Sequence, residues 1–97
     1  MGWYRFKVSG YSMFPLIKPG QIICVGTDEH EDFDVGDIIV FKKETFRCHR
    51  IVKKFRKNGK LVFVTKGDNN PEIDQYFVTL NEIIGKAEVI NPSDDRE

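Results

Sequence analysis

The sequence has few cysteines, no excess of either charge and no long hydrophobic run. Two of its 97 residues are cysteine, which is too few for a disulfide scaffold. Cys24 and Cys48 both stand in apolar segments typical of strands. We therefore expect two reduced thiols that behave as small buried hydrophobic side chains, with a single disulfide between them as the alternative.

The balance of charge does not favour nucleic acid as a partner. Fifteen Lys and Arg residues match fifteen Asp and Glu residues, so no overall field favours nucleic acid. No window reaches the ~18 apolar residues of a transmembrane helix, and no signal peptide opens the chain. We expect a soluble protein, cytoplasmic or peripheral to a membrane.

Length and composition indicate one folded domain. The chain is 40% hydrophobic and 31% charged, which is ordinary for a globular protein with a single core. We predict one domain over residues 1–90 and a frayed polar tail over 91–97. About six short alternating or apolar segments predict strands, and only residues 79–82 have the spacing of a helical capping box. The expected fold is mainly β, a small curled sheet or barrel.

Two charged segments have a structural and a functional interpretation. Residues 27–37 hold six acidic side chains and His30, but no calcium-loop spacing, so we expect a solvated loop without a metal or cofactor. The pair Asn58-Gly59 predicts a hairpin. Its basic tip is expected to be solvated, with binding of nucleic acid or peptide as the alternative. The basic residues are Lys53, Lys54, Arg56, Lys57 and Lys60.

Ser12 lies in a turn between a glycine and a proline, where a serine ordinarily has a structural role. Residues further along the chain favour a catalytic role for Ser12. His49 stands in a strand next to the apolar core, and Asp68 and Asp74 lie in the polar loop after the second hairpin strand. A serine, a histidine and an aspartate can act as nucleophile, general base and orienting group.

In this hypothesis the imidazole of His49 takes the proton of Ser12, and a carboxylate fixes the imidazole. Asp74 is the favoured orienting group, and Asp68 either supports the site or only holds its own turn. The backbone N–H of Ser12, with a neighbouring hydroxyl such as that of Ser9, would stabilise an oxyanion.

Five segments stand out in order along the chain: SGYSMFP at 9–15, GDIIVF at 36–41, HRIV at 49–52, TKGDNN at 65–70 and IGKA at 84–87. Together they resemble the successive boxes of type I signal peptidases, over residues 8–89. Bacterial signal peptidases and the related LexA-like peptidases use a lysine as base. The histidine at position 49 resembles the endoplasmic-reticulum, archaeal and sporulation-associated branch.

The resemblance implies Ser12 as nucleophile, His49 as base, Asp74 as third member of the triad and Asp68 as a supporting residue. It implies a mostly β, curled two-sheet domain that binds an extended peptide alongside its strands, with small residues before the cut. Three side chains would line or support the substrate pocket: Met13, Phe14 and Leu16.

The sequence therefore predicts a serine endopeptidase of the signal-peptidase type that cleaves a leader or signal segment from a precursor. Leu16 stands where the family has a small hydroxyl residue, and no membrane anchor is visible. A second interpretation is a trimmed form of an anchored peptidase, with Trp3, Tyr4 and Phe6 resting at a lipid surface. A third is a catalytically idle β module that binds peptide or nucleic acid through the basic hairpin.

Overall fold

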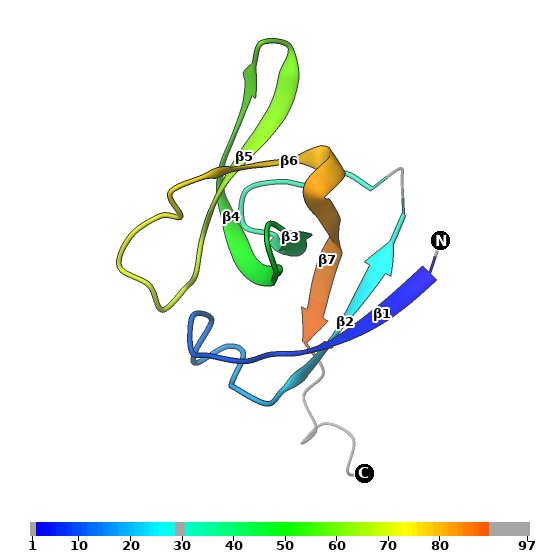
Figure 1. Ribbon diagram of the computed structural model, residues 1–97, viewed down its shortest axis with the longest axis vertical. Helices are drawn as coiled ribbons and strands as arrows, with labels where there is room; N and C mark the ends of the chain where they lie inside the picture. Colours follow the sequence, from blue (N-terminus) through cyan, green and yellow to red (C-terminus); the bar gives the residue numbers. More distant parts are fainter. Residues whose placement is uncertain (1, 29–30, 90–97) are drawn as a thin grey trace.

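The computed structural model describes residues 2–28 and 31–89. Within these ranges, seven strands form one antiparallel sheet that curls on itself, in the spatial order β1-β2-β7-β3-β4-β5-β6 (Figure 1). The mainly β, curled fold predicted from the sequence is confirmed. The predicted domain end at residue 90, the tail over 91–97 and His30 lie outside the described ranges. The strands are β1 (Gly2–Lys7), β2 (Ile22–Thr27), β3 (Ile38–Lys42), β4 (Phe46–Lys57), β5 (Lys60–Lys66), β6 (Phe77–Thr79) and β7 (Ile83–Val89).

One short helical turn, η1 (Leu80–Glu82), joins β6 to β7. Its capping-box signal in the sequence is confirmed, because the backbone N–H of Thr79 donates to Glu82 Oε1 over 2.9 Å. Glu82 also accepts a bond from Lys43 Nζ at 3.0 Å. The turn is therefore tied both to its own first residue and to the segment after β3.

The sheet buries one apolar cluster on each face of its central strands, because successive side chains of a strand point to opposite faces. On β3, Val40 joins one cluster and Ile39 and Phe41 the other. The inner cluster contains Met13, Ile17, Ile23, Val25 and Val40. The outer cluster contains Phe33, Ile39, Phe41, Ile51, Phe63 and Val78. β4 therefore runs between two cores, and its side chains divide between them.

The hairpin of β4 and β5 projects from the body of the molecule (Figure 1). Asn58 and Gly59 at its tip have φ angles of 52° and 79°, the two successive positive values that a tight hairpin turn requires. The predicted hairpin is confirmed. Among its basic side chains, Lys54 Nζ lies 2.9 Å from Asp34 Oδ1. The binding of nucleic acid or peptide by this hairpin stays an untested alternative to the predicted solvated tip.

Among the described residues, β1 forms one end of the sheet and pairs only with β2, where Trp3 lies opposite Gly26. A Cβ atom on Gly26 would lie 3.1 Å from the indole ring. The glycine therefore makes room for the indole to lie across the neighbouring strand, although Trp3 stays 63% exposed. One side of the indole therefore packs across the strand, and its other side faces outward.

Candidate active site

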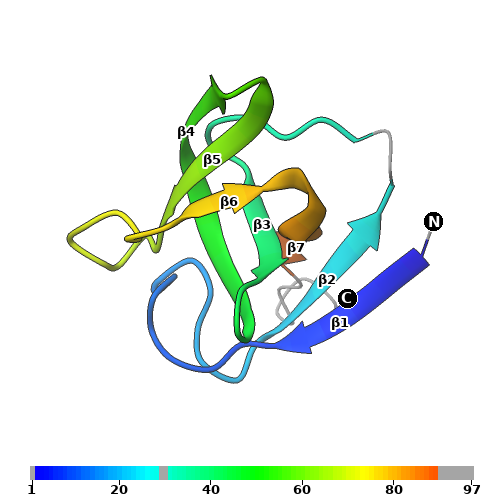
Figure 2. The same ribbon diagram turned by 45° about the horizontal axis from the view of Figure 1, so that its top comes forward.

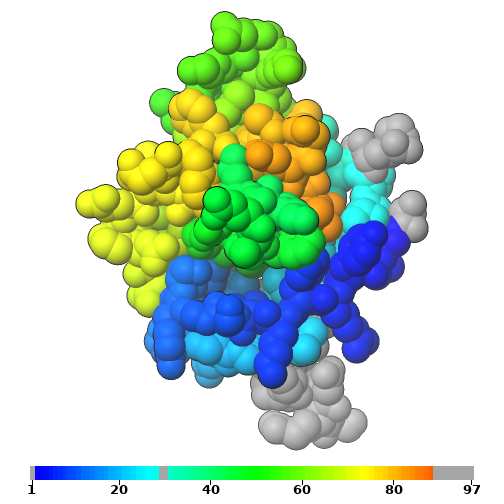
Figure 3. All heavy atoms as spheres, viewed as in Figure 1, coloured from blue at the N-terminus to red at the C-terminus, as the bar shows by residue number. Residues whose placement is uncertain are grey.

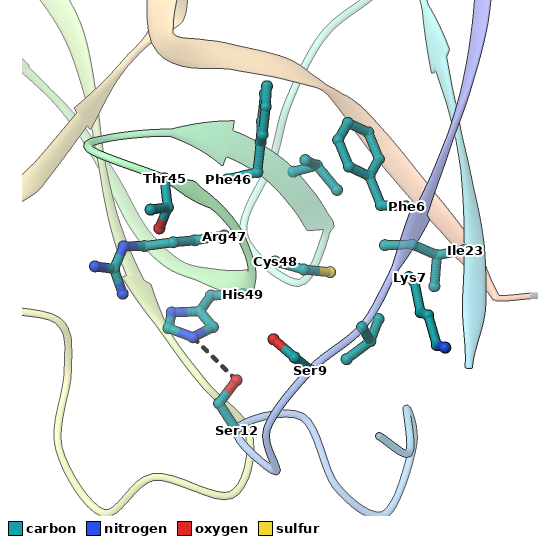
Figure 4. A pocket seen from close by; sticks show the side chains of 12 residues that line it. Phe6, Lys7, Ser9, Ser12, Ile23, Thr45, Phe46, Arg47, Cys48 and His49 are labelled. Carbon is teal, nitrogen blue, oxygen red and sulfur yellow. Dashed lines mark hydrogen bonds between the residues drawn. The ribbon is translucent and has the colours of Figure 1, made fainter. Parts of the chain in front are cut away.

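Three side chains from distant parts of the chain meet in one row. His49 Nε2 lies 3.2 Å from Ser12 Oγ, and His49 Nδ1 lies 2.6 Å from Asp74 Oδ2 (Figure 4 shows the first contact). His49 is only 7% exposed. A carboxylate that accepts the Nδ1–H leaves the lone pair of Nε2 directed at the serine hydroxyl. Such an arrangement can move a proton from the hydroxyl to the imidazole.

The turn that carries Ser12 is anchored in the inner apolar cluster by two of its own side chains, Met13 and Ile17. Within it, the N–H of Ile17 donates to the carbonyl of Met13 over 2.9 Å. That spacing places both side chains on the same side, where they are buried in the inner cluster. Gly10 opens the turn with a φ of 81°, a value that favours glycine. Ser12 is therefore carried by a fixed support, with its hydroxyl toward the cleft.

The loop after β5 is hydrogen-bonded to the same turn. The N–H of Asn69 donates to the carbonyl of Ser12 over 2.8 Å, and Asn69 Nδ2 donates to the carbonyl of Tyr11 over 3.0 Å. At Gly67 a Cβ atom would lie 2.8 Å from the Ser12 carbonyl oxygen and 3.0 Å from Ser12 Cβ. Only glycine permits so close an approach without a shift of the backbone.

Asp74 is held in place by Thr65, a neighbour outside the predicted triad. Thr65, fully buried at the end of β5, donates from Oγ1 to Asp74 Oδ2 over 2.7 Å. Its carbonyl accepts the N–H of Asp74 over 2.8 Å. Thr65 opens the TKGDNN segment that stands out in the sequence. Because a threonine is common in strands, the segment did not by itself indicate this contact. Burial, and after it the charge of Asp74, raises the pKa of the nearby Tyr76.

Asp68 lies beside the row without a hydrogen bond to His49. Its two carboxylate oxygens accept from Arg50 Nε and Nη2 over 2.9 and 2.8 Å. The hydrogen bond from Arg50 is the main cause that lowers the pKa of Asp68. Arg50 Nη1 also donates to the carbonyl of Gly36 over 2.7 Å. Asp68 thus links its loop to β4, while Asp74 contacts the imidazole.

A cleft of about 260 Å³ opens beside Ser12 and His49 (Figure 4). None of the three side chains expected at a substrate pocket lines it: Met13 is buried, whereas Phe14 and Leu16 are 39% and 47% exposed. The sequence did not indicate its walls, because alternation shows which residues share a face but not which strand lies opposite. The lining residues are Phe6, Lys7, Val8, Ser9, Ser12, Ile23, Val40, Thr45, Phe46, Arg47, Cys48 and His49.

The cleft lies between two strand segments with unpaired edges. In the described part of the chain, β1 pairs with β2 along one edge only, and β4 pairs with β5 only from Arg50 onward. Residues 46–49 of β4 therefore keep one edge without a neighbouring strand among the described residues. The two segments approach each other (Figure 2), and they adjoin on one face of the molecule (Figure 3). The ring centroids of Phe6 and Phe46 are 5.1 Å apart.

Both cysteines are free thiols, the state that the sequence favoured over a disulfide, and both are half-buried, less enclosed than expected. Cys48 borders the cleft, and burial raises its pKa to about 12. The described residues contain no group of three or more His, Cys, Asp or Glu side chains placed to hold a metal ion. Over the same residues, no helical segment has the length and apolar character needed to span a bilayer.

Comparison with known proteins gives a consistent set of similarities. The family model described as Peptidase S24-like matches residues 2–88. The human signal peptidase complex catalytic subunit SEC11C is 32% identical over 88 residues, covering 78% of this chain and 45% of SEC11C. The corresponding subunit sec11 of Neurospora crassa is 32% identical over 87 residues, covering 78% and 51%. The chain spans about half the length of these curated relatives. No solved structure gives a significant match.

Proposed function

The chain belongs to the Peptidase S24-like family, and from that premise we propose that it is a serine endopeptidase of the signal-peptidase type that removes a leader or signal segment from a precursor. The observation that carries the proposal is the row of contacts from Ser12 Oγ through the His49 ring to Asp74 Oδ2. Buried polar side chains need partners for stability. This row, however, ends on a hydroxyl that borders an open cleft.

In the proposed reaction, Ser12 Oγ attacks the carbonyl carbon of the scissile bond while His49 Nε2 takes the hydroxyl proton. Asp74 stabilises the imidazolium that forms. The protonated ring then gives its proton to the leaving amine, and an acyl-enzyme remains on Ser12. Water, activated by the same imidazole, hydrolyses that ester. The Ser12 N–H and the Ser9 hydroxyl, which borders the cleft (Figure 4), are the proposed oxyanion donors.

We propose that the substrate binds as an added strand in the cleft. The free edges of β1 and of residues 46–49 of β4 offer backbone groups on both sides of an extended peptide. Alternate side chains of that peptide would face the apolar floor, where the close approach of Phe6 and Phe46 favours small residues. Met13 supports the turn from within the core, and Phe14 and Leu16 are proposed to contact substrate outside the cleft.

Cleavage of a synthetic leader peptide with small residues before the cut, followed by mass spectrometry, tests the proposal. Ser12→Ala is expected to abolish cleavage, and His49→Ala to lower kcat by roughly 10³-fold or more. His30→Ala is the matched histidine control and should cleave normally. Undiminished cleavage by Ser12→Ala would remove the proposal.

Partners and location follow from the same likeness. The relatives are named catalytic subunits of a signal peptidase complex, and we propose that a precursor protein is the substrate and that the chain works at the periphery of a membrane. Co-sedimentation with anionic lipid vesicles measures this, with Trp3→Ser and Tyr4→Ser in one variant expected to reduce the bound fraction. Absence of vesicle binding by the unaltered chain would exclude a lipid contact of its own.

A further inference from the structure

The two strands that flank the cleft, β1 and β4, carry apolar side chains on the face toward the inner cluster and basic side chains on the opposite face, here called the outer face. On β1, Phe6 packs against the inner cluster, so Lys7 points to the opposite, outer face. On β4, Cys48 packs against the inner cluster, so Arg47 points to the outer face. A peptide strand added between them continues this alternation. Its side chains would face the apolar floor and the two cations in turn.

These cations lack acidic partners within the part of the chain that the structure describes. Lys7 and Arg47 are exposed and line the cleft, and the Arg47 guanidinium carbon lies 5.9 Å from the centre of the Tyr76 ring. None of the twelve lining side chains is acidic. Some cations elsewhere are paired with carboxylates, among them Lys43 with Glu82, Arg50 with Asp68 and Lys54 with Asp34.

We propose that the cleft selects peptides with acidic side chains at the outward-facing positions, the second and fourth residues before the scissile bond. This inference rests on the proposed function and specifies its substrate. The residue whose carbonyl reaches Ser12 enters the adjoining apolar floor, and so does the third residue before the bond. The second and fourth then lie between Arg47 on the β4 side of the cleft and Lys7 on its β1 side (Figure 4). Either cation would attract a carboxylate on its own side.

Peptide binding to the Ser12→Ala variant tests this without depending on catalysis. Fluorescence anisotropy would compare a leader peptide carrying Asp at the second position with its Asn counterpart. We expect the Asp peptide to bind about 3- to 10-fold more tightly at low salt, because exposed ion pairs are weak individually, with the ratio approaching one near ~0.5 M salt. Asp at the third position should instead bind more weakly than Asn, because it would face apolar side chains.

Charge-neutralising variants assign the effect to residues. In the Ser12→Ala background, Lys7→Gln and Arg47→Gln should each lower the Asp-to-Asn affinity ratio by about 2- to 3-fold. Lys60→Gln, which removes a cation at the distant hairpin tip, should leave it unchanged. A ratio of one in the parent, or a ratio insensitive to both substitutions, would overturn the proposal.

Cleavage by the unsubstituted chain separates this inference from the proposed function. If neither peptide is cleaved but the Asp peptide binds more tightly, the peptidase function fails and the charge preference stands. If both are cleaved and bound equally well, the function stands and the charge preference fails.

Discussion

Thr65 donates its hydroxyl hydrogen to Asp74 Oδ2, the same oxygen that lies 2.6 Å from His49 Nδ1. Asp74 Oδ2 thus contacts both the hydroxyl of the buried Thr65 and the imidazole of His49. Thr65 lies within β5 and is fully buried, and its β-branched side chain has few rotamers, so it fixes the position of the carboxylate. The direction of the His49 ring toward Ser12 depends on that position.

Thr65→Val keeps the shape of the side chain and removes its hydroxyl. We expect kcat for peptide cleavage to fall roughly 3- to 30-fold with little change in KM, because Asp74 would be less well positioned. The free energy of unfolding should fall by about 1 kcal/mol. Thr65→Ser, which keeps the donor, should recover most of kcat. A loss confined to stability would contradict a positioning role.

The ion pair of Asp68 and Arg50 should make stability depend on pH. Arg50 lowers the pKa of Asp68 in the folded chain, so its contribution is complete above the unfolded value of about 3.9 and is lost as pH falls toward the folded value. Asp68→Asn should therefore reduce the free energy of unfolding by roughly 0.5–1 kcal/mol at pH 7. Near pH ~3 it should reduce it by less.

Urea unfolding at both pH values measures this difference. Glu72→Gln, in the same loop, serves as the control because Glu72 is exposed and no ion pair to it occurs among the described residues. It should show no comparable gap at pH 7. An equal gap for Asp68→Asn at both pH values would show that the loss comes from packing and not from the ion pair.

The sequence indicated the local structure of this fold better than its long-range pairing. Alternating and apolar segments predicted short strands, and Asn58-Gly59 predicted the β4–β5 hairpin, because both signals act between residues close in sequence. The insertion of β7 between β2 and β3 has no local signal. It depends on which apolar faces can share a core, and short strands of similar composition do not specify this.

The same distinction applies to the site. Ser12, His49 and Asp74 were selected by residue type and order, whereas the walls of the cleft were not. The resemblance implied that Met13 would line or support the substrate pocket. Its side chain is buried in the inner cluster, beneath the turn that carries Ser12, and the hydrogen bond from the Ile17 N–H to the Met13 carbonyl holds it there.

Cys48 borders the cleft, yet it should be slow to alkylate. With a pKa of about 12, roughly one thiol in 10⁴ is ionised at pH 8, and the thiolate is the nucleophile. In a Cys24→Ser background, we expect iodoacetamide to modify Cys48 at least about 1,000-fold more slowly than free cysteine. Intact-mass measurement follows the reaction. Modification at a rate near that of free cysteine would show that the cleft stabilises the thiolate.

Gly67 should be more important for activity than for folding. Gly67→Ala would place a Cβ atom 2.8 Å from the Ser12 carbonyl oxygen, so the loop after β5 and the turn that carries Ser12 must move apart. We expect cleavage to fall by roughly 10- to 100-fold, since small displacements of a catalytic group are costly. Gly59→Ala is the control: its φ of 79° makes alanine unfavourable, but open space surrounds the site at the hairpin tip. It should cost about 1 kcal/mol of stability and leave cleavage intact, and an equal loss of activity in both variants would show that Gly67 acts only through stability.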